Sequence, residues 1–247
     1  MDRPIYSLFR LPLIAGAAWA INVTMTPPNP PPSPEQRVQP SIMERKLGFS
    51  TLIPTLAKVR RIMHYTSLVI LIWVFFICES STIVVGQFRP LQRLPFVTPV
   101  SVVASAMALS GGLIRRSCYN YLSKLFTFDL AILPDHRLIT SGPYSVVRHP
   151  SYSGAILSGV GTAMLFLGTR GSWLGRVFRA GIRKCKDMAG YKSGHFVYDT
   201  GQRYRVVWTV ILVPRARKED EMMKSQFGKE WEEWSPAFRW RLVPGIF

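Results

Sequence analysis

The chain has few of the residues that build metal sites or disulfide frameworks. Its 247 residues include three cysteines and four histidines. Cys78, Cys118 and Cys185 form no CxxC or CxxH pair and the histidines are scattered, whereas zinc sites place their ligands at short, regular spacings. We therefore expect neither a metal site nor a set of disulfides.

Charged residues are also scarce, at 18% of the chain against 48% hydrophobic residues. Four intervals contain no Asp, Glu, Lys or Arg: residues 11–26, 62–78, 94–114 and 150–169. The last two approach the ~20 residues that cross a ~30 Å hydrocarbon layer, and the interval from residue 62 reaches this length when Glu79 lies at the interface. Because buried helices of a soluble protein explain several such runs poorly, the sequence predicts an all-α, multi-pass integral membrane protein with about four to five spans plus interfacial helices.

The first apolar interval allows two interpretations. Two arginines precede a short apolar stretch, and Ala18-Trp19-Ala20 resembles a small-x-small cleavage site. Residues 1–26 are therefore either a first span or a signal-like segment.

The formal net charge of +17 is large enough for nucleic-acid binding. The positive residues, however, flank the apolar runs, as they do in cytosolic loops beside anionic lipid. These flanking residues are Arg60, Arg61, Arg89, Arg93, Arg115 and Arg116. We expect membrane lipid, and no nucleic acid, as the partner of this charge.

The stretch TSGPYSVVRHPSYSG, residues 140–154, breaks backbone regularity directly before an apolar run. A proline in the first turn of a helix is favourable because no N–H donor is needed there, so the simplest interpretation is a loop before a capped helix. Gly154, Ser158 and Thr162 then recur every four residues. Such a face of small residues predicts that another helix packs closely against this one.

The polar C-terminal part carries Met223, Phe227, Trp231 and Trp234 at steps of four, four and three. This spacing predicts one apolar helical stripe. Because tryptophan rings suit a headgroup boundary, a peripheral anchor helix is one interpretation of the stripe.

Two blocks together resemble a known family. LITSGPYSVVRHPSYSG, followed by RARKEDEMMKSQFGKEWEEW and the closing RLVPGIF, resembles the isoprenylcysteine carboxyl methyltransferase family, a group of multi-pass membrane enzymes that use S-adenosylmethionine. The resemblance covers residues 126–170 and 204–247. The second block is also similar to the tail of membrane sterol reductases. The first block, called the RHP block after Arg148-His149-Pro150, distinguishes this chain from them. Phospholipid N-methyltransferases share the broader pattern of a cofactor loop before a membrane hairpin and an acidic pair after it.

The resemblance implies S-adenosylmethionine-dependent methyl esterification of the C-terminal prenylcysteine carboxylate of prenylated proteins. It also implies an endoplasmic reticulum membrane location with the active site facing the cytosol. An α-carboxyl group has an ordinary pKa of about 3.3–3.7, so the nucleophile arrives ionised and needs no general base. Positioning of the reacting atoms away from water should then dominate the site. A phospholipid N-methyltransferase and a non-catalytic basic membrane anchor of the same ancestry are the alternatives.

The resemblance also assigns site residues, all of them for binding and positioning. The expected cofactor-binding residues are His136, Arg137, Leu138, Ile139, Tyr144, His149, Pro150, Ser151, Tyr152 and Glu219. Arg215, one helical turn before Glu219, would pair with the substrate carboxylate, and Arg148 is a second candidate for the same charge.

The chain departs from the family pattern at two places. Asp220 stands where a second glutamate is usual, which retains a carboxylate on a shorter arm. Residues 171–205 form a basic insert where the family makes a short turn, and VVWTVILVP offers nine residues before Arg215, too few to cross the hydrocarbon layer. Either the hairpin of two spans that the family makes here is incomplete or the insert is abnormal. A genuine insert that distorts the hairpin so that Arg215 and Glu219 miss the RHP loop would leave a binding-competent or inactive relative.

The predicted organisation has four parts. They are a first span or signal-like segment at 1–26, a Pro-rich linker and basic loop at 27–61, membrane spans and an interfacial helix at 62–135, and a methyltransferase catalytic region at 136–247 that contains the insert.

Overall fold

A computed structural model describes residues 8–37, 97–168 and 196–245, together with 74, 76–78, 80–81, 83–84 and 180. The predicted apolar run 62–78 lies mostly outside the described residues, as do residues 38–61 of the basic loop and most of the 171–205 insert.

The described part of the chain is helical. Its elements are α1 (Arg10–Met25), η2 (Pro34–Gln36), α5 (Pro99–Leu122), η3 (Ser123–Leu125), η4 (Gly142–Ser145), α6 (Pro150–Ala163), η5 (Met164–Gly168), α8 (Phe196–Phe227) and α9 (Lys229–Ala237). The all-α prediction is confirmed for these residues. None of the helices described combines the length and the apolar character that crossing a membrane requires, so the predicted four to five spans are not found among them.

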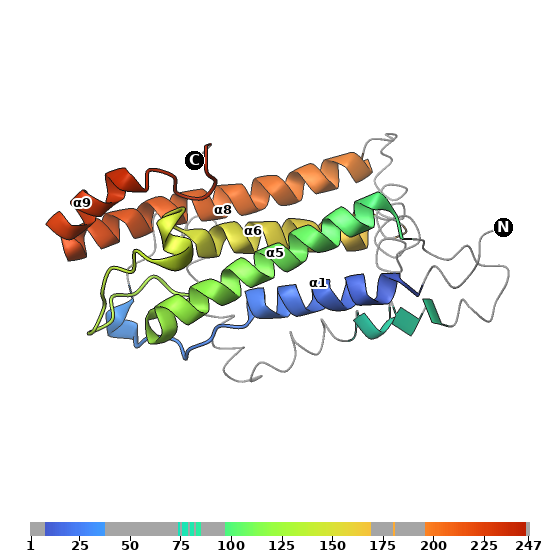
Figure 1. Ribbon diagram of the computed structural model, residues 1–247, viewed down its shortest axis with the longest axis horizontal. Coiled ribbons are helices and arrows are strands. Elements are labelled where there is room, and N and C mark those ends of the chain that lie inside the picture. The colour runs from blue at the N-terminus through green and yellow to red at the C-terminus, as the bar shows by residue number, and fades with distance from the viewer. Residues whose placement is uncertain are drawn as a thin grey trace.

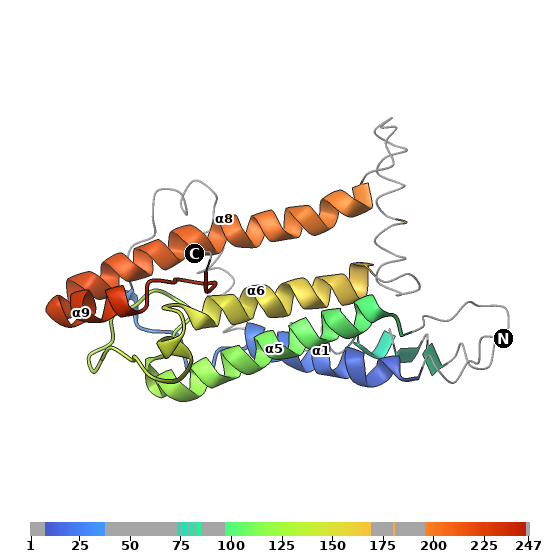
Figure 2. The same cartoon turned by 45° about the horizontal axis from the view of Figure 1, so that its top comes forward.

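Helices α1, α5 and α6 run lengthwise beside one another, and α8 lies on the α6 side, diverging from α6 away from the end where it meets α9 (Figures 1 and 2). The most extensive packing joins α5 to α6, and α1 packs mainly on α5. The loop between α5 and α6 lies at the end of the bundle where α8 meets α9. This arrangement brings the RHP block and the C-terminal block to one end of the molecule.

The predicted close packing against the small-residue face of α6 is confirmed. Gly111 of α5 lies directly against the backbone of Gly154 and Ser158, where a Cβ atom would collide with the Ser158 nitrogen. Gly161 approaches α5 in the same way, and a Cβ there would lie 2.5 Å from the carbonyl oxygen of Ala104. Small side chains thus let the two backbones come together.

Helix α1 belongs to the same core. Gly112 of α5 leaves no room for a Cβ beside Ala20, and Ile14 and Ala17 are fully buried. Residues 11–25 of the first apolar interval therefore pack as part of a helix of this bundle.

Helix α5 has a well-defined start and an early end. Thr98 and Ser101 form a reciprocal capping box, and Pro99 occupies the first helical position, where its missing N–H costs nothing. The region 62–135 was expected to end in an interfacial helix, but residues 115–122 instead continue α5. Ser123 then adopts a positive φ of 49°, which ends the helix.

The Pro-rich segment is fixed on the loop that follows α5. Asn29 donates to the carbonyl oxygens of Ser123 and Phe126, at 2.6 and 3.0 Å. Arg37 lies 3.6 Å from the Asp129 carboxylate. The segment is therefore more than a connector, because its contacts hold the start of the loop that leads from α5 to the candidate site.

Helix α8 begins at Phe196, inside the predicted insert, and continues through Pro214 to Phe227. The nine residues VVWTVILVP are thus part of a 32-residue helix. The prediction of one continuous stripe from Met223 to Trp234 is wrong, because Gly228 has a φ of +51° and separates α8 from α9.

Candidate cofactor and substrate site

The loop from Phe126 to His149 forms one wall of a cavity. Its shape depends on Gly142, whose φ of +63° favours glycine and whose α-carbon faces the ring of Tyr121. A Cβ at this position would overlap that ring. Pro150 then starts α6 and directs the next residues toward the cavity.

The cavity encloses about 860 Å³, including its open mouth. Nine of the ten predicted cofactor-binding residues line it: His136, Arg137, Leu138, Ile139, Tyr144, His149, Ser151, Tyr152 and Glu219. The tenth, Pro150, is buried at the first position of α6. Segments far apart in the sequence therefore converge on one cavity.

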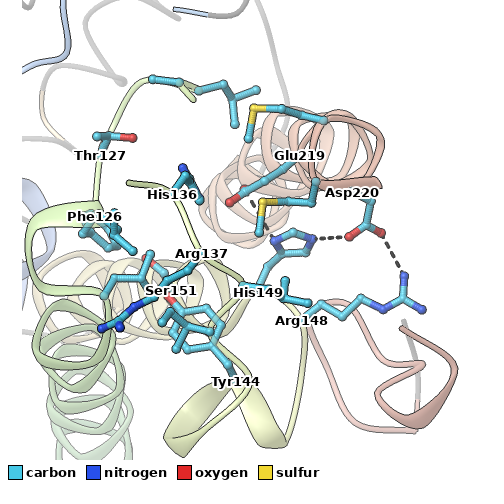
Figure 3. A pocket seen from close by; sticks show the side chains of 18 of the residues that line it. Phe126, Thr127, His136, Arg137, Tyr144, Arg148, His149, Ser151, Glu219 and Asp220 are labelled. Atoms are coloured by element: carbon cyan, nitrogen blue, oxygen red, sulfur yellow. Dashed lines mark hydrogen bonds and ion pairs between the residues drawn. The ribbon is translucent and has the colours of Figure 1, made fainter. Parts of the chain in front are cut away.

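His149 stands between two carboxylates (Figure 3). Its Nε2 atom is 2.9 Å from Oδ1 of Asp220, and its Nδ1 atom is 3.5 Å from Oε2 of Glu219. The ring also stacks with Tyr152, with 5.7 Å between ring centroids. Contacts on both ring nitrogens and on one face fix the imidazole in place.

Glu219 provides the test of whether a cofactor fits. Its Oε2 atom is buried and, apart from the 3.5 Å approach of Nδ1 of His149, has no hydrogen-bond partner among the residues that the structure describes. A buried carboxylate oxygen without a donor is costly, and a ligand with an ammonium or hydroxyl group would supply that donor. The positively charged S-adenosylmethionine, which has both kinds of group, fits this requirement.

Arg215 lies beside the cavity wall rather than in it. Its Nε atom donates to the Tyr152 hydroxyl at 3.0 Å, and an Nη2–H donates to the carbonyl oxygen of Phe128. Because Arg215 and Glu219 are one turn apart on α8, both reach the first turn of α6. That Arg215 and Glu219 share one site stays a prediction.

Arg148 does not face the cavity as a free cation. Its guanidinium donates to Asp220 at 3.1 Å and to the carbonyl oxygens of Ser235 and Phe238, both at 2.8 Å. These contacts occupy the group that was expected to bind the substrate carboxylate. Arg148 lines the cavity, but it is committed to the C-terminal part of the chain.

Asp220 has a more central place than its sequence position indicated. Besides His149 and Arg148, it accepts a hydrogen bond from Nε of Arg241 at 2.7 Å. Burial alone would raise the pKa of Asp220, but the hydrogen bond and charge of His149, with those of the two arginines, outweigh it and hold the pKa below its ordinary value. The carboxylate is thus ionised at neutral pH.

Arg115 was interpreted from the sequence as a membrane-flanking residue, yet it is only 7% exposed. Its Nη1 atom donates to the carbonyl and hydroxyl oxygens of Ser151, and Nε donates to Thr24 and to the hydroxyl of Tyr119. The guanidinium also lies 4.9 Å from the ring centroid of Phe128. Arg115 therefore holds the first turn of α6 from behind the cavity.

Two groups in the cavity wall are uncharged at neutral pH. Burial lowers the pKa of His136, and the negative charge of Glu219 opposes this shift in part. Burial also raises the pKa of Tyr144 well above its ordinary value. Neither side chain therefore adds a charge next to Glu219.

The aromatic residues of the C-terminal block line the cavity as well. Trp231 and Trp234 of α9 are both part of its wall, together with Met223 of α8. The guanidinium of Arg148 lies 5.4 Å from the ring centroid of Trp231, a cation–π distance. The interpretation of these rings as headgroup anchors leaves out this role in the site.

Comparison with known proteins supports the family resemblance. Residues 104–180 match the model of the isoprenylcysteine carboxyl methyltransferase (ICMT) family. The family resemblance is confirmed for this segment. It runs from α5 through the cavity loop and α6 into the insert, whereas the C-terminal block lies beyond it.

Relatives of two kinds are similar to this chain. Protein-S-isoprenylcysteine O-methyltransferase B of Arabidopsis thaliana is 32% identical over 68 residues, 27% of this chain and 34% of the relative. A probable protein-S-isoprenylcysteine O-methyltransferase of Oryza sativa subsp. indica is 37% identical over 80 residues, 32% of this chain and 40% of the relative. The Delta(14)-sterol reductase of Neurospora crassa is 27% identical over 119 residues, 45% of this chain and 24% of the relative. The matches thus span less than half of each of these relatives, and no solved structure matches the chain.

Proposed function

We propose that the chain is a methyltransferase that esterifies the C-terminal prenylcysteine carboxylate of prenylated proteins with S-adenosylmethionine. The observation that carries the proposal is the cavity that joins the RHP block to Glu219 and leaves one carboxylate oxygen of Glu219 without a hydrogen-bond donor. The match of residues 104–180 to the methyltransferase family and the two plant relatives support the same reaction class.

When bound, S-adenosylmethionine supplies a methyl group that is activated by the adjoining sulfonium. Glu219 accepts hydrogen bonds from polar groups of the cofactor and complements its positive charge. Tyr144 and His136 in the surrounding wall add no charge of their own beside Glu219.

Arg215 is the residue that we assign to the substrate carboxylate. It lies one turn before Glu219 and is held by Tyr152, whose side chain also lines the cavity. A guanidinium binds a carboxylate with two parallel N–H donors, which fixes the orientation of the nucleophilic oxygen. The carboxylate is already ionised at neutral pH, so orientation and exclusion of water are what the chain must provide.

We also propose that the protein acts in the endoplasmic reticulum membrane with the site facing the cytosol. The support for this location is the positive charge at the ends of the apolar runs, which is typical of cytosolic flanks. Epitope accessibility of tagged loops in intact and permeabilised microsomes tests the orientation.

The test of the reaction uses membranes that contain the full chain, labelled S-adenosylmethionine and a farnesylated cysteine analogue. Wild type is compared with His149→Ala, Glu219→Gln and the matched control Glu233→Gln, which changes an exposed carboxylate of α9. We expect the base-labile methyl ester signal to be lost in the first two variants and to stay at the wild-type level in the control. Equal background signal in all four proteins would overturn the proposal.

Two parallel acceptors separate the competing activities. Methyl transfer to a phosphatidylethanolamine vesicle instead of the cysteine analogue would assign the phospholipid reaction. Because part of the similarity is to sterol reductases, a third sample contains a Δ14-sterol and a reduced nicotinamide cofactor in place of the methyl donor. Sterol reduction in that sample, with no methyl transfer in the others, would replace the proposed function.

A further inference from the structure

Three segments of the chain meet at the carboxylate of Asp220. Oδ1 is 2.9 Å from Nε2 of His149 in the RHP loop, whereas Oδ2 is 3.1 Å from Nη1 of Arg148 and 2.7 Å from Nε of Arg241. Asp220 itself is on α8 and is 6% exposed. Each oxygen therefore serves a different purpose, one for the histidine and one for the two arginines.

The C-terminal segment, residues 238–242, is also joined to the RHP loop by its backbone. The amides of Arg148 and His149 donate to the carbonyl oxygens of Trp240 and Arg241, both at 2.9 Å. The Ser153 hydroxyl donates to the carbonyl oxygen of Leu242, whose side chain is buried. Figure 1 shows this segment returning from α9 along α8 toward α6. The cavity loop is thus clamped by residues that lie about 90 positions later in the chain.

Asp220 carries the negative charge that balances the positive groups where the C-terminal segment meets the RHP loop. These contacts between the RHP loop and residues 238–242 are called the clamp below. Two arginines and a histidine surround it, and Glu219 is the other carboxylate that faces His149. An ionised carboxylate only accepts hydrogen bonds, so the Nε2 atom of His149 carries the hydrogen in this contact. The Nδ1 atom is thereby turned toward Glu219 and the cofactor cavity. Without the carboxylate, Arg148, whose side chain is 11% exposed, and the more exposed Arg241 would face each other as like charges.

We propose that Asp220 is a positioning residue that couples the docking of the C-terminal segment to the orientation of His149 in the cofactor cavity. One of its oxygens sets the imidazole, and the other holds the C-terminal segment over the loop that carries the imidazole. The effect on cofactor binding rests on the proposed function, whereas the effect on docking does not.

The experiment measures both effects in the full-length protein. Variants are Asp220→Asn, Asp220→Glu and Arg241→Gln, with Arg239→Gln as the matched control, because Arg239 is exposed and contacts the ring of Trp240 rather than Asp220. Hydrogen exchange of the amides at 238–245 reports docking in the absence of any ligand. The KM values for S-adenosylmethionine and for the farnesylated cysteine analogue report the site.

We expect Asp220→Asn to speed exchange of the C-terminal segment and to raise the KM for S-adenosylmethionine by about tenfold or more, since a buried charge-assisted contact is lost. The KM for the cysteine analogue should change little. A general loss of folding would impair both KM values, so this difference separates the two explanations. Asp220→Glu should restore part of both values. Arg241→Gln should release the segment with a smaller effect on the KM, because the contact between Asp220 and His149 remains.

Unchanged exchange in Asp220→Asn and in Arg241→Gln, relative to Arg239→Gln, would overturn the proposal. If Asp220→Asn fails to fold, Arg241→Gln decides the docking half on its own. If the wild-type protein does not bind S-adenosylmethionine, the proposed function fails, while fast exchange in the variants still supports the clamp.

Discussion

Nη1 of Arg115 donates to both oxygens of Ser151, at 3.0 Å to the carbonyl and 2.8 Å to the hydroxyl. This pair joins the interior of α5 to the first turn of α6, where the cavity wall begins. The hydrogen bonds of Arg115 within the described residues all go to neutral oxygens, and aromatic rings cover the guanidinium. The buried guanidinium thus donates to several acceptors from different nitrogen atoms, which the single ammonium group of a lysine cannot reproduce.

Arg115→Lys should lower the free energy of unfolding by about 2–4 kcal/mol, because several buried acceptors lose their donor together. Arg116→Lys is the matched control, since Arg116 is the exposed neighbour on the same helix and should stay within about 0.5 kcal/mol of wild type. Denaturant unfolding in the same detergent or buffer measures both variants. Equal stability of the two variants would contradict the assigned contacts.

Gly111→Ala should cost about 1–3 kcal/mol, because the new methyl group overlaps the backbone of α6 and the helices must separate. Gly228→Ala provides a contrast, since its Cβ meets nothing within 4 Å and only its φ of +51° is unfavourable. We expect about 1 kcal/mol for that variant. Thermal unfolding compares them, and a larger effect at Gly228 would argue against tight packing of α5 on α6.

Docking of the C-terminal segment should resist acid. The pKa of Asp220 is lower in the folded chain than the ordinary value of about 3.9, so its contribution to stability is complete above pH ~3.9 and is lost as the pH falls through the folded pKa. Hydrogen exchange at 238–245 should therefore stay slow from pH 7 to about pH 4, after correction for the intrinsic rate, and increase below it. Faster exchange of the C-terminal segment already near pH 6 would show that a group other than Asp220 controls docking.

His136 should give the protein a separate acid sensitivity. Its pKa is lowered on folding, so the stability linked to it is complete above the unfolded value of about 6.5 and declines as the pH falls from there toward the folded pKa. His136→Gln cannot titrate and should show a flatter stability profile below pH ~6.5. Unfolding measured across pH 5 to 8 checks this, and parallel profiles for the two proteins would refute it.

Arg215→Lys should weaken the acceptor more than the cofactor. A lysine keeps the charge but loses the forked pair of donors, so we expect the KM for the farnesylated cysteine analogue to rise by about tenfold while the KM for S-adenosylmethionine stays near wild type. Arg239→Lys serves as the exposed control. A rise confined to the cofactor KM would move Arg215 from the substrate to the cofactor.

Some features of the molecule were readable from the sequence because they depend on neighbouring residues. The spacing of Gly154 and Ser158 is local, and it correctly predicts a closely packed partner helix. The RHP block and Glu219 were linked only through the family resemblance, yet the structure does bring His149 and Glu219 to one cavity. Their roles toward a cofactor stay predictions.

Other features depend on how distant segments meet, which no local pattern encodes. The place of Asp220 follows from the return of Arg241 across the RHP loop, and the contact of Arg115 with Ser151 follows from the pairing of α5 with α6. The separation of α8 from α9 had a local signal in Gly228, because an isolated glycine near the end of a helical pattern marks a possible stop. The aromatic spacing around it concealed that signal.

The clamp at Asp220 also determines when the cavity can be completed during protein synthesis. The RHP loop leaves the ribosome long before residues 238–242 are made, and Arg148 and His149 have until then no backbone partners from that segment. A nascent chain that already contains the whole cavity loop therefore still lacks contacts that complete the small-molecule site.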